Sequence, residues 1–141
     1  MAKRDEYLDQ LHSVSLFSQC SRRELQKIAK ASDEVSLPEG KEFVQQGATG
    51  REAFVIVSGT AAVKRSGRKI ASVGPGDCVG EMSLLDHLPR TASVVAETPM
   101  EALVLESRRF AAVLDEVPSL ARKVMAALAT RVRNLDSKVY G

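Results

Sequence analysis

The sequence predicts a mainly β domain, a sandwich or barrel, with helices at both ends of the chain. Many short apolar or alternating segments between residues 33 and 106 are separated by Gly and Pro turn signals, which is typical of such folds. The segments on either side show helical spacing and helix start signals. The chain has 141 residues, of which 44% are hydrophobic and 27% charged, and this suits one domain with a hydrophobic core.

Two helices are expected in residues 1–32. Residues 5–12 and 22–31 look helical, and the pair Ser21 and Glu24 is a capping-box pattern at the start of the second helix.

The strands are expected in residues 33–106. The apolar run 53–57 suits a buried strand, and Ser66-Gly67-Arg68 has the length and glycine content of a hairpin loop between strands 60–65 and 69–73. The remaining expected strands are 34–37, 43–44, 91–96 and 100–105.

Helices return in residues 107–141. Ser107 can cap a helix that runs through Leu114, and Pro118 fits the first position of another that could reach Val139. At about 1.5 Å per residue the last helix is roughly 33 Å long, so its far end is expected to leave the β core and to need a cover. Its apolar residues step by three or four and form one stripe: Leu120, Val124, Leu128, Val132, Leu135 and Val139.

Residues 80–92, Gly-Glu-Met-Ser-Leu-Leu-Asp-His-Leu-Pro-Arg-Thr-Ala, are the most informative segment. Gly80 allows a close approach to a ligand, and a short helix from Glu81 would present free N–H groups to an anion. Arg90 offers a planar fork for two phosphate oxygens, and Thr91 adds a hydroxyl. The acidic Glu81 suits neutral hydroxyls such as those of a ribose. The segment therefore predicts a pocket for a small phosphate ester.

Gly-Glu-Met-Ser-Leu-Leu followed by Pro-Arg-Thr-Ala resembles the phosphate-binding cassette of cyclic nucleotide-binding domains, and we call residues 80–92 the cassette. The step of nine residues from Glu81 to Arg90 is within the range usual for that family. Residues 11–17 and 21–25 resemble the family's N-terminal helical motif. Four glycines fall at its expected turns, so that nearly the whole chain is covered: Gly40, Gly47, Gly59 and Gly76.

The resemblance implies a single domain, 1–141, with an antiparallel β jelly-roll barrel, N-terminal helices, a short cassette helix and a long C-terminal helix. The N-terminal helices would occupy 1–32, the β-roll 33–106 and the C-terminal helices 107–141. Glu81 would hold the ribose 2′-hydroxyl and Arg90 the cyclic phosphate. The implied cyclic nucleotide-binding residues are Gly80, Glu81, Met82, Ser83, Arg90, Thr91 and Ala92.

The resemblance also gives the long helix two alternative roles, as a lid over the base or as the contact of a homodimer. Arg131 and Leu135 are the candidates for contact with the base. The ligand preference leans to cAMP, with cGMP as the alternative. A hydroxyl at Thr91 could reach the guanine amino group, but bacterial cAMP receptors carry a hydroxyl there too.

The main hypothesis is a regulatory sensor whose C-terminal helix changes position on binding and whose output passes through an unidentified protein effector or a second copy. Two alternatives stay open: a non-sensing interaction module with the same fold, and an excised sensor of a channel, kinase or transcription regulator. Direct DNA binding is not expected. The net charge is only +2, and the chain ends at Gly141, before the helix-turn-helix domain that DNA-binding relatives carry.

No nucleophile, catalytic base or metal cluster is readable, so neither an enzyme nor a cofactor other than the nucleotide ligand is expected. His12 and His87 are too few and too scattered to hold a metal, and Cys20 and Cys78 are expected to be free, buried or half-buried thiols. No run reaches the roughly eighteen apolar residues of a membrane span, and the N-terminus lacks the apolar core of a signal peptide. The expected location is therefore the cytoplasm, with no membrane contact.

Overall fold

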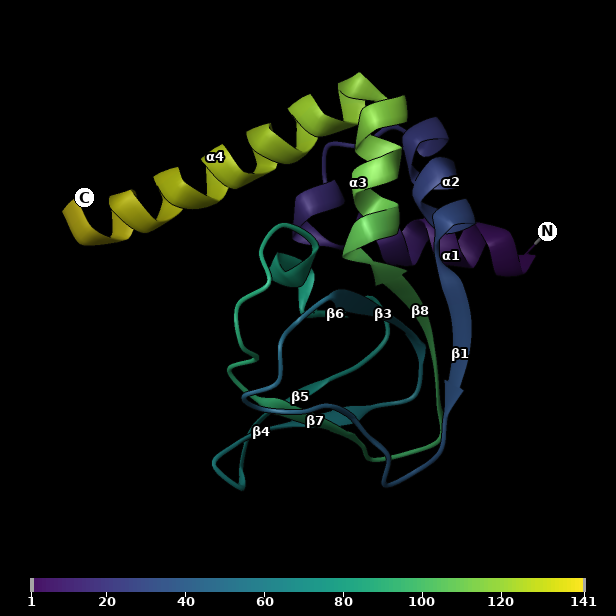
Figure 1. Ribbon diagram of the computed structural model, residues 1–141, viewed down its shortest axis with the longest axis vertical. Coiled ribbons are helices and arrows are strands. Elements are labelled where there is room, and N and C mark those ends of the chain that lie inside the picture. The colour runs from purple at the N-terminus through teal and green to yellow at the C-terminus, as the bar shows by residue number, and fades with distance from the viewer. Residues whose placement is uncertain (1, 141) are drawn as a thin grey trace.

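The computed structural model describes the backbone of residues 2–140 and the side chains of residues 7–135. Figure 1 shows the helices gathered at one end of the β region, with the last helix running away from the strands. The helical elements are α1 (Ala2–His12), the 3₁₀ turn η1 (Ser15–Phe17), α2 (Arg22–Ala31), the 3₁₀ turn η2 (Glu81–Leu84), α3 (Ser107–Glu116) and α4 (Pro118–Tyr140). The strands are β1 (Asp33–Leu37), β2 (Glu42–Val44), β3 (Glu52–Ser58), β4 (Ala61–Arg65), β5 (Arg68–Val73), β6 (Cys78–Val79), β7 (Ser93–Ala96) and β8 (Met100–Glu106).

The strands form two four-stranded antiparallel sheets, in the orders β1-β8-β3-β6 and β2-β7-β4-β5. This is the two-sheet arrangement of a jelly roll, so the predicted mainly β fold with flanking helices is confirmed. The sheets pack as separate layers and do not close into a barrel. The predicted hairpin lies between β4 and β5, where Ser66 and Gly67 have φ values of 52° and 81°, as a tight primed turn requires.

Two apolar clusters hold the layers together, and β3 contributes to both because its side chains alternate between its faces. Ala53, Val55 and Val57 pack with the helices, around the buried rings of Phe17 and Phe110. The intervening Phe54 and Ile56 pack against residues of the second sheet. The apolar run of residues 53–57 is therefore buried on both faces, as its continuous hydrophobicity predicted.

The predicted capping box at the start of α2 is confirmed. The Ser21 N–H donates to Glu24 Oε1 at 2.8 Å, and the Glu24 N–H donates to Ser21 Oγ at 3.2 Å. The prediction that Ser107 caps α3 was wrong. Glu106 is the N-cap residue without a side-chain cap, and Ser107 Oγ lies 3.0 Å from Nε2 of His87 instead.

Several element boundaries differ from the sequence prediction by one to three residues, and one strand was not predicted. The strand predicted from Thr91 begins at Ser93. The two-residue strand β6 was not predicted, because Cys78 and Val79 are too few to show any periodicity. The helix predicted from Asp5 begins at Ala2.

The first half of α4 is anchored to α2 and to the core. Leu120 and Val124 are buried, and the buried carboxylate of Glu24 accepts hydrogen bonds from Ser119 Oγ at 2.6 Å and Lys123 Nζ at 2.5 Å. Burial alone would raise the pKa of Glu24, but these hydrogen bonds, with those at Ser21, lower it to about 2.

The second half of α4 runs beyond the β region, as its length predicted (Figure 1). Val132 and Leu135 are 56% and 57% exposed, whereas Leu128 still packs partly against the core. The predicted apolar stripe is therefore split between a buried near half and an uncovered far half. Val139, its last predicted member, lies outside the residues whose side chains are described.

A search of the described helices finds none with the length and apolar character that crossing a bilayer requires.

Candidate functional site

The cassette begins with a glycine in a conformation that other residues rarely adopt. Gly80 has φ 78° and ψ 28°, which is the left-handed region, and it leads directly into η2. The N–H of Ser83 donates to the Gly80 carbonyl at 2.9 Å, so the turn is a tight 3₁₀ turn. The predicted single turn of helix after Gly80 is confirmed, and it buries the Ser83 side chain beneath it.

Arg90 is held from both its backbone and its side chain. Its N–H donates to the Ala48 carbonyl at 2.7 Å, and its carbonyl accepts from Gly47 N–H at 2.9 Å. The guanidinium donates from Nη1 to Ser83 Oγ at 3.0 Å and from Nη2 to the Glu52 carbonyl at 2.9 Å. Burial lowers the pKa of Arg90, but a guanidinium still carries its charge at neutral pH. The site thus contains an oriented, half-buried cation.

Two glycines make room for this arrangement. A Cβ on Gly80 would collide with Nη1 of Arg90, and a Cβ on Gly50 would collide with Oγ of Ser83. Gly80 was predicted to allow a close approach, and the structure shows that Arg90 itself makes this approach. Gly50 and the carbonyl of Glu52 were missed, because neither a backbone carbonyl nor a single glycine in a turn carries a specific sequence signal.

Glu81 divides its two carboxylate oxygens between different surroundings. Oε1 accepts a hydrogen bond of 2.6 Å from Nη2 of Arg131 on α4. Oε2 is buried and has no hydrogen-bond partner among the described residues. The other terminal nitrogen of Arg131, Nη1, lies 3.2 Å from the sulfur of Met82. The structure therefore joins α4 to the first two residues of η2.

The end of the cassette is more open. Thr91 is exposed, Ala92 is half-buried, and the Thr91 carbonyl accepts a hydrogen bond of 3.2 Å from Nε of Arg65. Gly80, Ser83 and Arg90 are therefore in mutual contact, while the Thr91 side chain lies at the surface.

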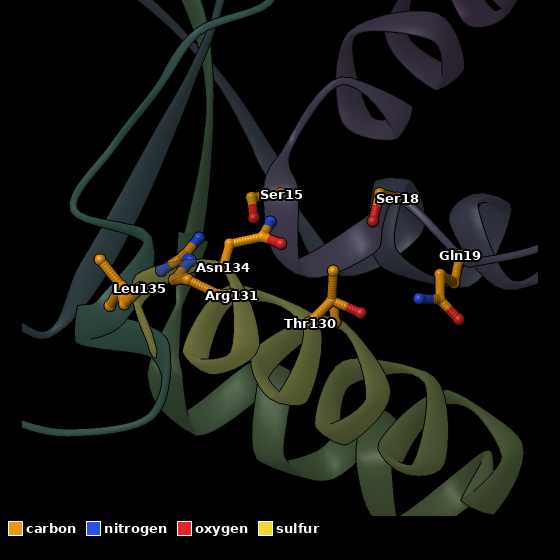
Figure 2. A pocket seen from close by; sticks show the side chains of 8 residues that line it. Ser15, Ser18, Gln19, Thr130, Arg131, Asn134 and Leu135 are labelled. Carbon is orange, nitrogen blue, oxygen red and sulfur yellow. The ribbon is translucent and has the colours of Figure 1, made fainter. Parts of the chain in front are cut away.

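The two candidates for base contact, Arg131 and Leu135, line a pocket of about 300 Å³ between η1 and α4. Figure 2 shows Arg131 and Leu135 at one end of this pocket and Thr130 with Gln19 at the other. No cassette residue lines it, and Leu135 is exposed. Arg131 thus reaches the cassette through Glu81 and Met82.

Cys78 lies beside the cassette and Cys20 lies in the helical core, and both are free. Burial raises the pKa of both thiols, to about 11 for Cys20, so neither is a reactive thiolate at neutral pH. Within residues 7–135 no group of three His, Cys, Asp or Glu side chains could hold a metal ion. The arrangement offers a fixed cation and a carboxylate acceptor, which together suit an anionic ligand with a free hydroxyl.

Comparison with known proteins identifies the family of this chain. The sequence pattern of the cyclic nucleotide-binding domain matches residues 34–117. The chain is 36% identical over 104 residues to the Cyclic AMP receptor protein of Thermus thermophilus, covering 70% of this chain and 48% of that protein. It is 31% identical over 114 residues to the Pycsar effector protein XpPycTIR of Xanthomonas perforans, covering 79% of this chain and 38% of that protein. The chain thus spans about half or less of these relatives.

Among solved structures, the N-terminal domain of a transcriptional regulator from Streptomyces coelicolor A3(2) superposes with a TM-score of 0.87 at 29% identity, covering 92% of this chain and 96% of that one. The pattern match reaches from β1 to the end of α3 and includes the whole cassette. The chain belongs to the cyclic nucleotide-binding domain family.

Proposed function

We propose that this domain is a regulatory sensor that binds a cyclic nucleotide, with cAMP preferred and cGMP as the alternative ligand. The family supports the ligand class. The preference for cAMP rests on the 36% identity to a protein named as a cyclic AMP receptor. The domain acts by binding and not as an enzyme, because its site has hydrogen-bond partners for a ligand but no evident nucleophile or base.

One observation carries the proposal: the oriented guanidinium of Arg90 and the unpartnered carboxylate oxygen of Glu81 both lie at the short turn η2. The Arg90 guanidinium lies against Gly80 and Ser83, where it can turn its charge to a cyclic phosphate. Glu81 Oε2 is a buried acceptor without a donor among residues 7–135, and such atoms cost free energy until a donor arrives. The ribose 2′-hydroxyl of a cyclic nucleotide would supply that donor. Ser83 and Thr91 would add hydrogen bonds, with Met82 and Ala92 as neighbours.

The output would pass through α4, which contacts the cassette through Arg131. Helix α4 exposes Met125, Val132 and Leu135, which are spaced along one side of the helix. We propose that a second copy of the chain or a protein effector covers this face. No DNA contact is part of this proposal.

The alternative is a non-sensing interaction module that keeps the fold and uses only the exposed face of α4. Thermal unfolding with cAMP, cGMP and 5′-AMP separates the two functions. Each nucleotide is added at about one hundred times a micromolar dissociation constant, where specific binding adds about 2.7 kcal/mol to the free energy of unfolding. This corresponds to an increase of several degrees in Tm.

The sensor predicts a shift with a cyclic nucleotide and none with 5′-AMP. It also predicts that Arg90→Leu loses the shift while remaining folded, because this change removes the phosphate's cation. An Arg90→Leu variant that binds as tightly as the parent would contradict the assigned site. No shift of the parent with any of the nucleotides would favour the interaction module.

A further inference from the structure

Met82, the second residue of η2, places a thioether at the surface beside a charged hydrogen-bond donor. Its side chain is partly exposed, at 39%, and its sulfur lies 3.2 Å from Nη1 of Arg131 on α4. The other terminal nitrogen of Arg131, Nη2, donates to Glu81 at 2.6 Å. A thioether sulfur is only a weak acceptor, whereas a carboxylate oxygen is a strong one. Nη1 is therefore the nitrogen of this guanidinium that a stronger acceptor would satisfy better.

The other methionines with described side chains provide a comparison within the same chain. Met100 is 2% exposed and packs in the apolar cluster of the second sheet, where an oxidant in solution does not reach it. Met125 lies on α4 and is 60% exposed, and its sulfur has no hydrogen-bond donor among residues 7–135. Met82 and Met125 are thus both accessible in the folded protein, but only Met82 has a charged donor next to its sulfur.

A peroxide is the class of oxidant that reacts with an accessible thioether, and hydrogen peroxide is the simplest. A sulfur lone pair attacks one peroxide oxygen, so that the S–O bond forms while the O–O bond breaks. The transferred oxygen passes its proton to the departing hydroxide, which leaves as water. The sulfur is oxidised by two electrons and the peroxide is reduced by two. The apolar side chain becomes a polar methionine sulfoxide.

The local geometry favours a bond between this new oxygen and Arg131. Methionine is unbranched and has three rotatable bonds, so its side chain can turn the oxygen toward Nη1 without a shift of the backbone. A hydrogen bond from a charged donor is about twice as strong as one between neutral groups. The side chain of Arg131 is 33% exposed, so water competes for it less than at an open surface.

We propose that Met82 is a redox-sensitive modification site: a peroxide converts its thioether to the sulfoxide, whose oxygen binds the Arg131 guanidinium more strongly than the sulfur does. The modification goes beyond nucleotide binding and does not depend on it, because the sulfur and its donor both belong to the chain. It ties the far half of α4 to η2 by a second strong acceptor, beside Glu81. Methionine sulfoxide reductases reverse it, so the contact responds to the balance of oxidant and reductase.

The test compares two variants that each keep one accessible methionine. Met125→Leu retains Met82, and Met82→Leu retains Met125 as the matched control, while Met1 and Met100 are present in both. Each variant is treated with hydrogen peroxide without nucleotide. Peptide mass spectrometry locates the added oxygen, and circular dichroism checks the fold. Amide hydrogen exchange in residues 128–135 is measured before oxidation, after it, and after reduction by the two methionine sulfoxide reductases, one for each epimer.

Met82 and Met125 should gain oxygen in the folded protein, whereas Met100 should not. Oxidation of Met82 in the Met125→Leu variant should slow exchange in residues 128–135 by about threefold, and the reductases should restore the original rate. The oxidised Met82→Leu variant should exchange as it did before treatment. With Arg131→Leu added to Met125→Leu, oxidation of Met82 should leave exchange unchanged, because the donor is gone.

Four results would overturn the proposal. Oxidation of Met125 without oxidation of Met82 would show that the sulfur beside Arg131 is shielded. Faster exchange or unfolding after oxidation of Met82 would show that the sulfoxide disrupts the contact. Slowing of the same size without Arg131 would show that the new oxygen binds elsewhere. Unchanged exchange with Arg131 present would show that it binds nothing on α4. No nucleotide is added, so each result is independent of the proposed function.

Discussion

Gly80 is the residue whose replacement tests the cassette geometry most sharply. Its φ is 78°, and a Cβ added to it would collide with the Arg90 guanidinium. Gly67, in the turn between β4 and β5, has a φ of 81° but nothing within 4 Å of an added Cβ. Gly67→Ala therefore measures the cost of the left-handed backbone alone. The difference between the two variants measures the collision with Arg90 together with the closer approach to the Glu52 carbonyl, 3.1 Å from the added Cβ.

The structure sets the size of both effects. A left-handed conformation costs a residue with a Cβ about 1–2 kcal/mol, and the smaller entropy of the unfolded alanine chain offsets about 0.4–1 kcal/mol of this. Gly67→Ala should thus lower the free energy of unfolding by about 1 kcal/mol. In Gly80→Ala the displaced Arg90 also loses its hydrogen bonds to Ser83 and Glu52, of 3.0 and 2.9 Å. Because water can replace part of these contacts, we expect their loss to lower the free energy of unfolding by about 2 kcal/mol in addition.

Urea unfolding and cAMP titration of both alanine variants provide the assay. Gly80→Ala should be about 3 kcal/mol less stable than the parent and should bind cAMP at least a hundredfold more weakly, about 2.7 kcal/mol. Gly67→Ala should bind like the parent. In an Arg90→Leu background most of the extra cost at Gly80 should disappear, because the guanidinium is gone and only the Glu52 carbonyl, 3.1 Å from an added Cβ, remains too close. Equal losses of stability at the two glycines, with Arg90 present, would refute the reasoning.

Two further predictions concern the two halves of α4. Glu24→Gln keeps the capping box but loses the charge opposite Lys123. Urea unfolding at several pH values should therefore show it about 1–2 kcal/mol less stable at pH 7, a modest figure because the lysine side chain is 36% exposed. The pKa of Glu24 is lowered to about 2 in the folded state, whereas that of an unfolded glutamate is about 4.3, so its charge stabilises the fold fully above about pH 4.5. The difference in stability between parent and variant should therefore close as the pH falls from about 4.5 toward 2. A difference that stays constant over this range would contradict the prediction. If a second copy covers the far half of α4, the chain should sediment as a dimer and Val132→Asp as a monomer with its fold intact, whereas a monomeric parent would exclude this partner.

The fold could be predicted from the sequence because its signals are local and repeated. The run of residues 53–57 is apolar throughout and is buried on both faces, and Ser21 with Glu24 marked the start of α2. The errors occur where a tertiary contact outweighs a local preference. Ser107 is a favourable N-cap residue, yet its hydroxyl lies against His87. It is the first residue of the helix, and Glu106 takes the N-cap position.

The candidate site divides in the same way. The charged members Glu81 and Arg90 could be found by their spacing, because the family resemblance is carried by side chains. Glu52 could not, since its contribution is a carbonyl oxygen thirty-eight residues away from Arg90 in sequence. Helix register predicts Arg131 as a contact for the base. The structure places its guanidinium on Glu81, the residue to which the family resemblance assigns the ribose.

The energetics of α4 limit what this contact can do alone. A partly exposed ion pair contributes on the order of 1 kcal/mol, which changes a population ratio by about fivefold. Moving a helix from 1:99 to 99:1 needs about 5.5 kcal/mol of differential binding. The pair of Arg131 and Glu81 can therefore bias the far half of α4 but cannot switch it. A complete switch requires that the ligand-favoured position also cover Val132 and Leu135, which are now more than half exposed. Burying two such side chains can contribute about 1.5–3 kcal/mol each. For this reason we expect the sensor's response to nucleotide to be small in the isolated chain and large only in the presence of the partner that covers α4.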